Sequence, residues 1–136
     1  MNIYFAGSIR GGRNDQDYYC RIIEMLKDFG EVLTEHIGSK TLDSSGEDLL
    51  PSSQIYHRDV EWLEQSNFLV ADVSSPSLGV GLEIGYAIKQ DTPVLCLFRE
   101  EEGRRLSAMI EGNPAVTVCT YKSIKEIPGI LLAFFS

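Results

Sequence analysis

The 136-residue sequence has no excess of basic residues and no long apolar run. It carries 12 Lys and Arg against 20 Asp and Glu, a formal net charge of −8 at pH 7. Nucleic-acid backbones are held by an excess of Lys and Arg, so this charge excludes a sequence-independent nucleic-acid binder. No apolar run approaches the ~20 residues that cross a bilayer, and the N-terminus "MNIYFAGSIRGG" lacks the features of a signal peptide. We expect a soluble cytoplasmic protein, or a nuclear one in a eukaryote, that binds no membrane.

Cysteine and histidine are also scarce. Cys20, Cys96 and Cys119 are odd in number, widely spaced and set among apolar residues, so they are expected to be reduced thiols in the core. The metal-binding spacings H-E-x-x-H, C-x-x-C and the EF-hand loop do not occur, and neither does the G-x-S-x-G elbow of many serine hydrolases. The sequence therefore predicts no metal site, no cofactor and no serine-hydrolase chemistry.

What the sequence does contain is a regular alternation of short apolar runs and longer amphipathic ones. Its length and its 43% hydrophobic content predict a single domain, residues 1–136, with a substantial core. Several of the short runs are too continuously apolar to have one wet face, which is typical of parallel strands buried between helices. The expected strands are 2–6, 31–35, 67–72, 93–98 and 115–121, and the expected helices are 14–30, 51–66, 78–90 and 122–134. This order predicts an α/β fold: a doubly wound, open, five-stranded parallel sheet in three α/β/α layers, Rossmann-like or flavodoxin-like.

Sheets of this kind bind ligands beyond the carboxyl ends of their strands. The loops of interest are therefore 7–13, 73–79 and 99–107. The stretch 37–50, "IGSKTLDSSGEDLL", is polar and rich in Gly and Ser, so we expect a mobile surface loop that covers the strand ends.

The first of these loops, "GSIRGGR", has the composition of a phosphate cradle. Its three glycines let backbone N–H groups approach an anion, the following helix adds the positive end of its dipole, and Arg10 and Arg13 supply charge. It matches neither the G-x-G-x-x-G nor the P-loop pattern. An ordinary tight turn with solvated arginines is the alternative interpretation.

One acid of the second helix falls on its inward stripe. Asp59 lies four residues after Ile55 and three before Trp62, so it is expected to be poorly hydrated and, if unpaired, to keep its proton as a general acid does. A structural acid bonded to a neighbouring backbone group or to Arg58 is the alternative. Asn14 and Asp15 are candidate caps of the first helix.

Another acid, Glu83, stands alone in the apolar stretch "SPSLGVGLEIG". A helix that starts near Ser77 or Leu78 gives it apolar neighbours at both helical spacings, and no Lys or Arg lies within four positions. Glycines at 79 and 81 are unfavourable in a helix, and indicate close approach of a ligand to its start. A glutamate that merely faces water is the alternative.

Tyrosine and histidine supply the other candidates. Tyr4 alternates with apolar residues in the first strand, and a buried hydroxyl there needs a partner. His36 follows the second strand and is a candidate ligand contact, whereas His57 is expected at the surface.

The sequence also resembles, in order and over nearly its whole length, the 2′-deoxynucleoside 5′-monophosphate N-glycosidases of the nucleoside 2-deoxyribosyltransferase superfamily. The matching blocks are "IYFAGSIRGGR" (3–13), "VLTEHI" (32–37), "RDVEWL" (58–63), "VADVSSPSLGVGLEIGYA" (70–87), "LCLFR" (95–99) and "GRRLSAMIEG" (103–112). The resemblance weakens in 38–55 and after 113, which leaves the base preference open.

This resemblance implies a homodimeric hydrolase that splits a deoxynucleotide into free base and 2-deoxyribose 5-phosphate through a glycosyl-enzyme intermediate. It implies that Glu83 is the nucleophile and that Tyr4 and Asp59 are the other catalytic residues. The substrate contacts that it implies are Gly7, Ser8, Ile9, Arg10, Ser77 and Gly79, with Ser107 and nearby Met109 from the neighbouring subunit. Two alternatives remain: a deoxyribosyltransferase that acts on unphosphorylated nucleosides, and a non-catalytic nucleotide-binding module.

Overall fold

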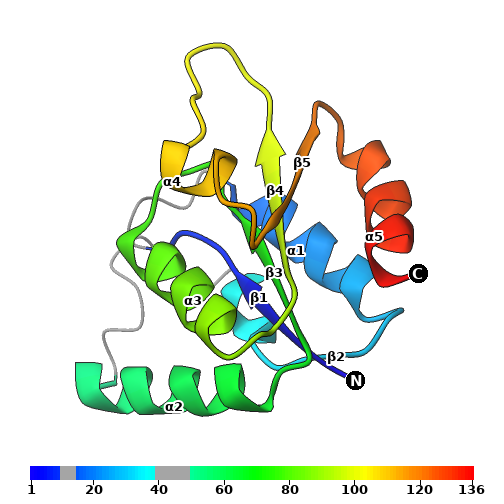
Figure 1. Cartoon of the computed structure of the whole chain (residues 1–136). Coiled ribbons are helices and arrows are strands. Elements are labelled where there is room, and N and C mark those ends of the chain that lie inside the picture. The colour runs from blue at the N-terminus through cyan, green and yellow to red at the C-terminus, as the bar shows by residue number, and fades with distance from the viewer. Residues whose placement is uncertain (10–14, 39–49) are drawn as a thin grey trace.

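The described residues of the computed structural model, 1–9, 15–38 and 50–136, form an α/β fold around one parallel sheet (Figure 1). The five strands lie in the order β2-β1-β3-β4-β5, and every neighbouring pair is parallel. The strands are β1 (Asn2–Ala6), β2 (Glu31–Val32), β3 (Phe68–Asp72), β4 (Val94–Arg99) and β5 (Thr117–Tyr121). This confirms the predicted doubly wound parallel sheet.

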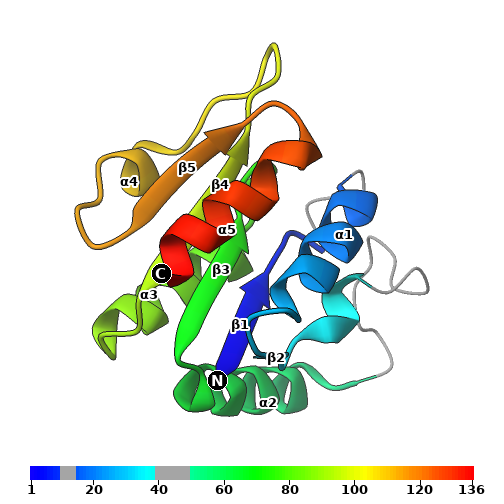
Figure 2. The same ribbon diagram turned by 90° about the vertical axis from the view of Figure 1, so that its right-hand side faces the viewer.

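Helices cover both faces of the sheet (Figure 2). They are α1 (Gln16–Leu26), α2 (Ser52–Gln65), α3 (Leu78–Lys89), α4 (Ala108–Glu111) and α5 (Ile127–Phe135), with 3-10 turns η1 (Glu35–Gly38) and η2 (Ile124–Glu126). Alternate residues of each strand point to opposite faces. Ile3 and Phe5 of β1 pack with α1 and α5, while Tyr4 and Ala6 pack with α2 and α3. Tyr4 is thus placed by strand register on the α2 and α3 side.

The second strand is shorter than expected. The sequence predicts a strand over 31–35, but pairing with β1 ends at Val32. The Thr34 side chain then takes the place of a strand backbone: its Oγ1 accepts from the Phe5 N–H at 2.8 Å and donates to the Phe5 carbonyl at 2.6 Å. Both polar groups of Phe5 are satisfied in this way, so the chain is free to turn into η1 and carry His36 over the sheet edge.

Other boundaries also differ from the expectations. The first helix spans Gln16–Leu26 rather than 14–30, and Asp15 stands at its start without a side-chain cap bond. The expected surface loop 37–50 lies largely outside the described residues, but its first residues, Ile37 and Gly38, are buried in η1. The short helix α4 was not predicted. Within the described ranges, none of the helices has the length and apolar character that a membrane span requires.

We expect Thr34→Val to lower the free energy of unfolding by about 2 kcal/mol, because it leaves the buried N–H and C=O of Phe5 without partners at nearly unchanged volume. Urea denaturation followed by circular dichroism measures the change. Thr34→Ser is the matched control, since it keeps the hydroxyl. An equal loss in both variants would show that methyl packing, rather than the two hydrogen bonds, accounts for the effect.

Candidate active site

A pocket of about 470 Å³ opens beside the carboxyl end of β1, between η1, α2 and the start of α3. The structure brings eight of the predicted site residues together in its lining: Tyr4, Gly7, Ile9, His36, Asp59, Ser77, Gly79 and Glu83. They come from four separate segments of the chain. The position agrees with the rule that open α/β sheets bind ligands at the strand ends.

Glu83 lies in this pocket beside Tyr4, and its environment opposes ionisation. The pKa of Glu83 is raised from 4.5 to about 7. Burial is the main cause and the nearby Asp59 charge adds to it, whereas the hydrogen bond with the Tyr4 hydroxyl acts in the opposite direction. Tyr4 is itself buried, and burial together with Glu83 raises its pKa far above the usual value. Tyr4 therefore remains a hydrogen-bond donor at physiological pH. The water-facing alternative for Glu83 is wrong.

Asp59 is paired. Arg58 donates to its Oδ1 from Nε at 3.0 Å and from Nη2 at 2.9 Å, and both side chains are about a quarter exposed, at 27% each. The Arg58 guanidinium also lies 4.8 Å from the centre of the Trp62 ring and 3.4 Å from His36 Nε2. The ion pair that the sequence offered as an alternative is thus present, and it lies inside the pocket with Glu83. His57, as expected, is exposed.

The described part of the first loop packs tightly under the pocket. A Cβ on Gly7 would lie only 2.9 Å from the Tyr19 ring, so this position requires glycine. The Ser8 N–H donates to the Tyr19 hydroxyl at 3.0 Å. The Ser8 hydroxyl is completely buried, does not line the pocket, and has no hydrogen-bond partner among residues 1–9, 15–38 and 50–136. Arg10 and Arg13 lie outside the described residues.

The start of α3 forms the facing wall. Ser77 is the N-cap, and its hydroxyl accepts from the Val80 N–H at 3.3 Å. A Cβ on Gly79 would come no closer than 3.8 Å to the Glu83 carboxylate and the Ser77 hydroxyl, so protein atoms do not require a glycine there. Gly81 does not line this pocket but a second one on the other side of α3.

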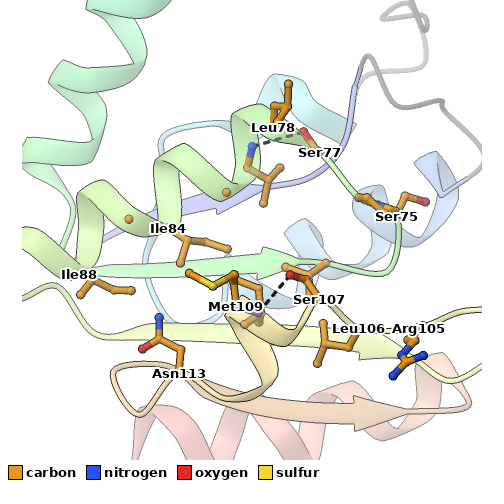
Figure 3. A pocket seen from close by; sticks show the side chains of 16 residues that line it. Ser75, Ser77, Leu78, Ile84, Ile88, Arg105, Leu106, Ser107, Met109 and Asn113 are labelled. Carbon is orange, nitrogen blue, oxygen red and sulfur yellow. Dashed lines mark hydrogen bonds between the residues drawn. The ribbon is translucent and has the colours of Figure 1, made fainter.

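Ser107 and Met109 are not in the Glu83 pocket. They line a second one, of about 520 Å³, between α3 and α4 (Figure 3). Ser77 and Leu78 line both pockets. Ser107 caps α4 through the Met109 N–H at 3.3 Å, and its side chain is exposed.

Sequence reasoning missed a buried polar cluster beneath these loops. Asp15 does not cap α1 but pairs with Arg99, and Asp72 accepts from the Tyr121 hydroxyl at 2.9 Å. The available signal was a charged residue at the end of an otherwise apolar strand, as in "VLCLFR" and "FLVAD". In the part of the chain that the structure covers, His, Cys, Asp and Glu form no group of three suited to a metal ion.

We expect Glu83→Gln to stabilise the fold at pH 8. Because the folded-state pKa of Glu83 is raised from 4.5 to about 7, folding loses stability as pH rises through this range, and the penalty is complete above it. The variant should gain on the order of 2 kcal/mol at pH 8 and nothing below pH ~4. Denaturant titrations across pH measure this, with exposed Glu102→Gln as control. A gain independent of pH would contradict the assignment.

Comparison with known proteins identifies the family of the chain. Residues 3–116 match the family model described as nucleoside 2-deoxyribosyltransferase. The chain is 48% identical to the 5-hydroxymethyl-dUMP N-hydrolase of Tetraodon nigroviridis, over 100% of this chain and 98% of the relative. It is 54% identical to a putative 2′-deoxynucleoside 5′-phosphate N-hydrolase 1 of Trichoplax adhaerens, over 82% and 75%.

A solved structure shares the fold. The CMP N-glycosidase of Clostridium botulinum superposes with a TM-score of 0.66, covering 98% of this chain and 99% of its own, at 17% identity. At this identity the likeness supports the architecture alone. On the family match and the two relatives together, the chain belongs to the nucleoside 2-deoxyribosyltransferase family.

Proposed function

We propose that this protein is a glycosidase that hydrolyses the N-glycosidic bond of 2′-deoxynucleoside 5′-monophosphates, giving free base and 2-deoxyribose 5-phosphate. The observation that carries the proposal is the desolvated Glu83 carboxylate beside Tyr4, in a pocket whose walls include the glycine loop and the α3 start. The names of the relatives, which are N-hydrolases of deoxynucleoside 5′-phosphates, support the same reaction.

In the proposed mechanism Glu83 attacks C1′ of the deoxyribose as the bond to the base nitrogen breaks. The base leaves with the electron pair of that bond and takes a proton from solvent, while Asp59, paired with Arg58, accepts a hydrogen bond from the base. Water then hydrolyses the glycosyl ester and releases Glu83. A pKa of about 7 leaves a large fraction of Glu83 ionised at neutral pH, while poor hydration keeps the carboxylate reactive. The protonated Tyr4 orients it and stabilises its charge.

The 5′-phosphate is proposed to bind between Gly7, Ser8 and Ile9 on one side and Ser77 and Gly79 on the other. Backbone N–H groups at the start of α3 are proposed to supply donors there, together with the Ser8 hydroxyl, which is unbonded among the described residues and would have to turn toward the pocket. This arrangement gives a protein of net charge −8 a local anion site. Arg10 and Arg13 of the same loop are proposed to add positive charge.

The base then lies toward η1 and α2. Ile9, Ile37 and Ile55 make that part of the pocket apolar, and His36 stands at it as a flat polar group. This is a surface on which a planar base can stack. The relatives' names make 5-hydroxymethyl-dUMP a substrate to test first.

The family also contains transferases, as its model's description says. The second candidate is therefore a nucleoside 2-deoxyribosyltransferase, which would use Glu83 in the same way but pass the sugar to another base and accept unphosphorylated nucleosides. A non-catalytic nucleotide-binding module is less well supported, because a binder gains nothing from a carboxylate whose ionisation is made costly.

We expect the protein to release free base from 5-hydroxymethyl-dUMP or deoxyguanosine monophosphate, with the corresponding nucleosides far poorer substrates. Glu83→Gln should lower kcat by at least ~10³-fold, because no attacking group remains. Chromatographic detection of free base measures both. Turnover of nucleoside and nucleotide alike, or base transfer in preference to hydrolysis, would favour the transferase; binding of nucleotide without any turnover would favour the non-catalytic module.

We also infer a homodimer in which Ser107 of one subunit completes the pocket of the other. Leu78, Leu82 and Met109 are exposed by 96%, 67% and 79%, and they lie on neighbouring parts of α3 and α4. Gly81 and Gly85 on α3 have nothing within 4 Å of a Cβ position, which permits close approach of another backbone. An apolar face of this kind indicates an interface.

Ser107 supports the same inference. Within one subunit it lines the α3 and α4 pocket and not the Glu83 pocket, although the two meet at Ser77 and Leu78. In the proposed dimer, a neighbouring molecule seated against α3 brings its Ser107 hydroxyl toward the Glu83 pocket. A two-fold arrangement makes the contribution reciprocal.

A complementation experiment tests this arrangement. Glu83→Gln and Ser107→Glu should each be inactive as pure proteins, the second because its carboxylate repels the phosphate. Mixed dimers contain one intact site, so an equal mixture should recover about a quarter of wild-type activity, by random assortment of subunits. Light scattering gives the mass, and Leu82→Glu should yield monomers. A mixture that stays inactive while the subunits exchange would contradict the shared site.

We further infer that residues 1–136 act as one catalytic domain in the cytoplasm. Both apolar clusters pack on the same sheet, which supports a single folding unit. Cys20, Cys96 and Cys119 all lie in described parts of the chain and are free thiols, which accords with a reducing compartment.

A further inference from the structure

Beneath the loops of the proposed phosphate site lies a set of buried ionic contacts, here called the Asp15 cluster, which consists of Asp15, Ser75, Arg99 and Arg104. Asp15 is 1% exposed and Arg99 3%. Arg99 Nη2 donates to Asp15 Oδ1, Arg104 Nη2 donates to the same oxygen at 3.3 Å, and the Ser75 hydroxyl donates to Asp15 Oδ2 at 2.7 Å. Both carboxylate oxygens of Asp15 are therefore in use.

The cluster joins three loops that are far apart in sequence. Asp15 stands between the first loop and α1, Ser75 lies two residues before the α3 cap Ser77, and Arg104 lies three residues before Ser107. Arg104 Nη1 also donates to the Ser74 carbonyl at 2.6 Å. The start of α1, the Ser77 turn and the segment before Ser107 are thus tied together through a single carboxylate.

Arg99 anchors the cluster to the sheet. It ends β4, its backbone N–H donates to the Ser74 hydroxyl at 2.8 Å, and its guanidinium lies 3.9 Å from the centre of the Tyr18 ring on α1. Glu101 accepts from Arg99 Nε at 2.8 Å and from Arg104 Nε at 2.7 Å, so two acids balance two guanidinium groups.

Stability alone does not account for such a cluster. Removing charged groups from water costs several kcal/mol per ion, and well-packed apolar residues are often as stable in their place. What charged, directional contacts supply is a fixed geometry, since each bond works only at one distance and angle. The bonds here lie beside the Ser77 turn, which belongs to the Glu83 pocket of the same subunit, and beside the segment that carries Ser107, which is proposed to complete the pocket of the other subunit.

We propose that the Asp15 cluster is a positioning device for the 5′-phosphate, which sets the spacing of the α1 start, the Ser77 turn and the Ser107 segment. This inference rests on the proposed function, and it assigns Asp15, Arg99 and Arg104 as positioning residues that do not themselves touch substrate. None of the three lines either the Glu83 pocket or the α3 and α4 pocket.

The direction in which one substitution changes KM for the nucleotide distinguishes a positioning role from a direct electrostatic effect. If Asp15 acted only through its charge, Asp15→Asn would remove a negative group near the bound phosphate and lower KM for the nucleotide. If Asp15 is a positioning residue, its replacement allows the loops to move apart. The nucleotide KM should then rise about tenfold, with kcat changed by no more than about twofold. KM for the unphosphorylated deoxynucleoside should change little, since that ligand does not use the phosphate contacts.

Two further variants keep the test decisive if Asp15→Asn does not fold. Ser75→Ala removes one bond to Asp15 without any change of charge and should raise the nucleotide KM about threefold. Arg104→Met should raise it more, and Arg104→Lys should restore part of the loss. The matched control is Gln90→Met at the far end of α3, which breaks side-chain bonds to the Leu63 carbonyl and Thr92 away from the loops.

Steady-state kinetics of base release from the same deoxynucleoside monophosphate gives KM and kcat for every variant. Thermal denaturation shows whether each variant is folded. The proposal is overturned if Asp15→Asn lowers KM, if Ser75→Ala and Arg104→Met leave it unchanged, if KM rises equally for nucleoside and nucleotide, or if Gln90→Met has the same effect. A wild-type protein that releases no base refutes the proposed function instead, so the two failures are distinct.

Discussion

The contact between the Glu83 carboxylate and the Tyr4 hydroxyl is the constraint around which the rest of the structure is arranged. Burial makes the charged form of Glu83 unfavourable, and the hydrogen bond from Tyr4 partly offsets that cost, which leaves the pKa near 7. Such a balance holds only if the phenol cannot move away. Tyr4 cannot, because it belongs to β1, which pairs with strands on both sides and is covered by helices on both faces. The interior place of β1 in the sheet therefore holds the Tyr4 hydroxyl beside Glu83.

The acids near the proposed binding loops are paired or buried. An acidic protein that binds an anion must remove its own carboxylates from the binding loops or neutralise them. Here Asp15 is neutralised by two guanidinium groups and Asp59 by Arg58, while Asp72 is held inside by Ser74 and Tyr121. The positive ends of α1 and α3 then act at the strand ends. Most of the acids among the described residues are exposed.

Periodicity and strand composition were sufficient to predict the fold, since five apolar runs separated by amphipathic helices allow few other architectures. They were also sufficient to single out Glu83, because an acid with apolar neighbours at both helical spacings is unusual in any helix. What could not be predicted depends on contacts distant in sequence. The Thr34 bonds that end β2 join residues 29 apart, and the pairing of Asp15 with Arg99 joins residues 84 apart. Asp15 resembles a helix cap in the sequence, because no neighbouring residue indicates that it pairs with the Arg99 guanidinium.

Helix α3 has one acid, three glycines and apolar residues on nearly every side. This composition is explained by the three faces of the helix, each of which has a different neighbour. Val80, Ile84 and Ala87 pack on the sheet, Gly79 and Glu83 face the pocket, and Leu78, Leu82 and the glycines at 81 and 85 face outward. Glycine lowers helix propensity by about 1 kcal/mol each relative to alanine, so α3 needs packing on several sides to remain formed. The sheet supplies one side, and a partner on the outward face would supply another. A rigid α3 in turn fixes Glu83, so in the proposed dimer the position of the proposed nucleophile depends on assembly.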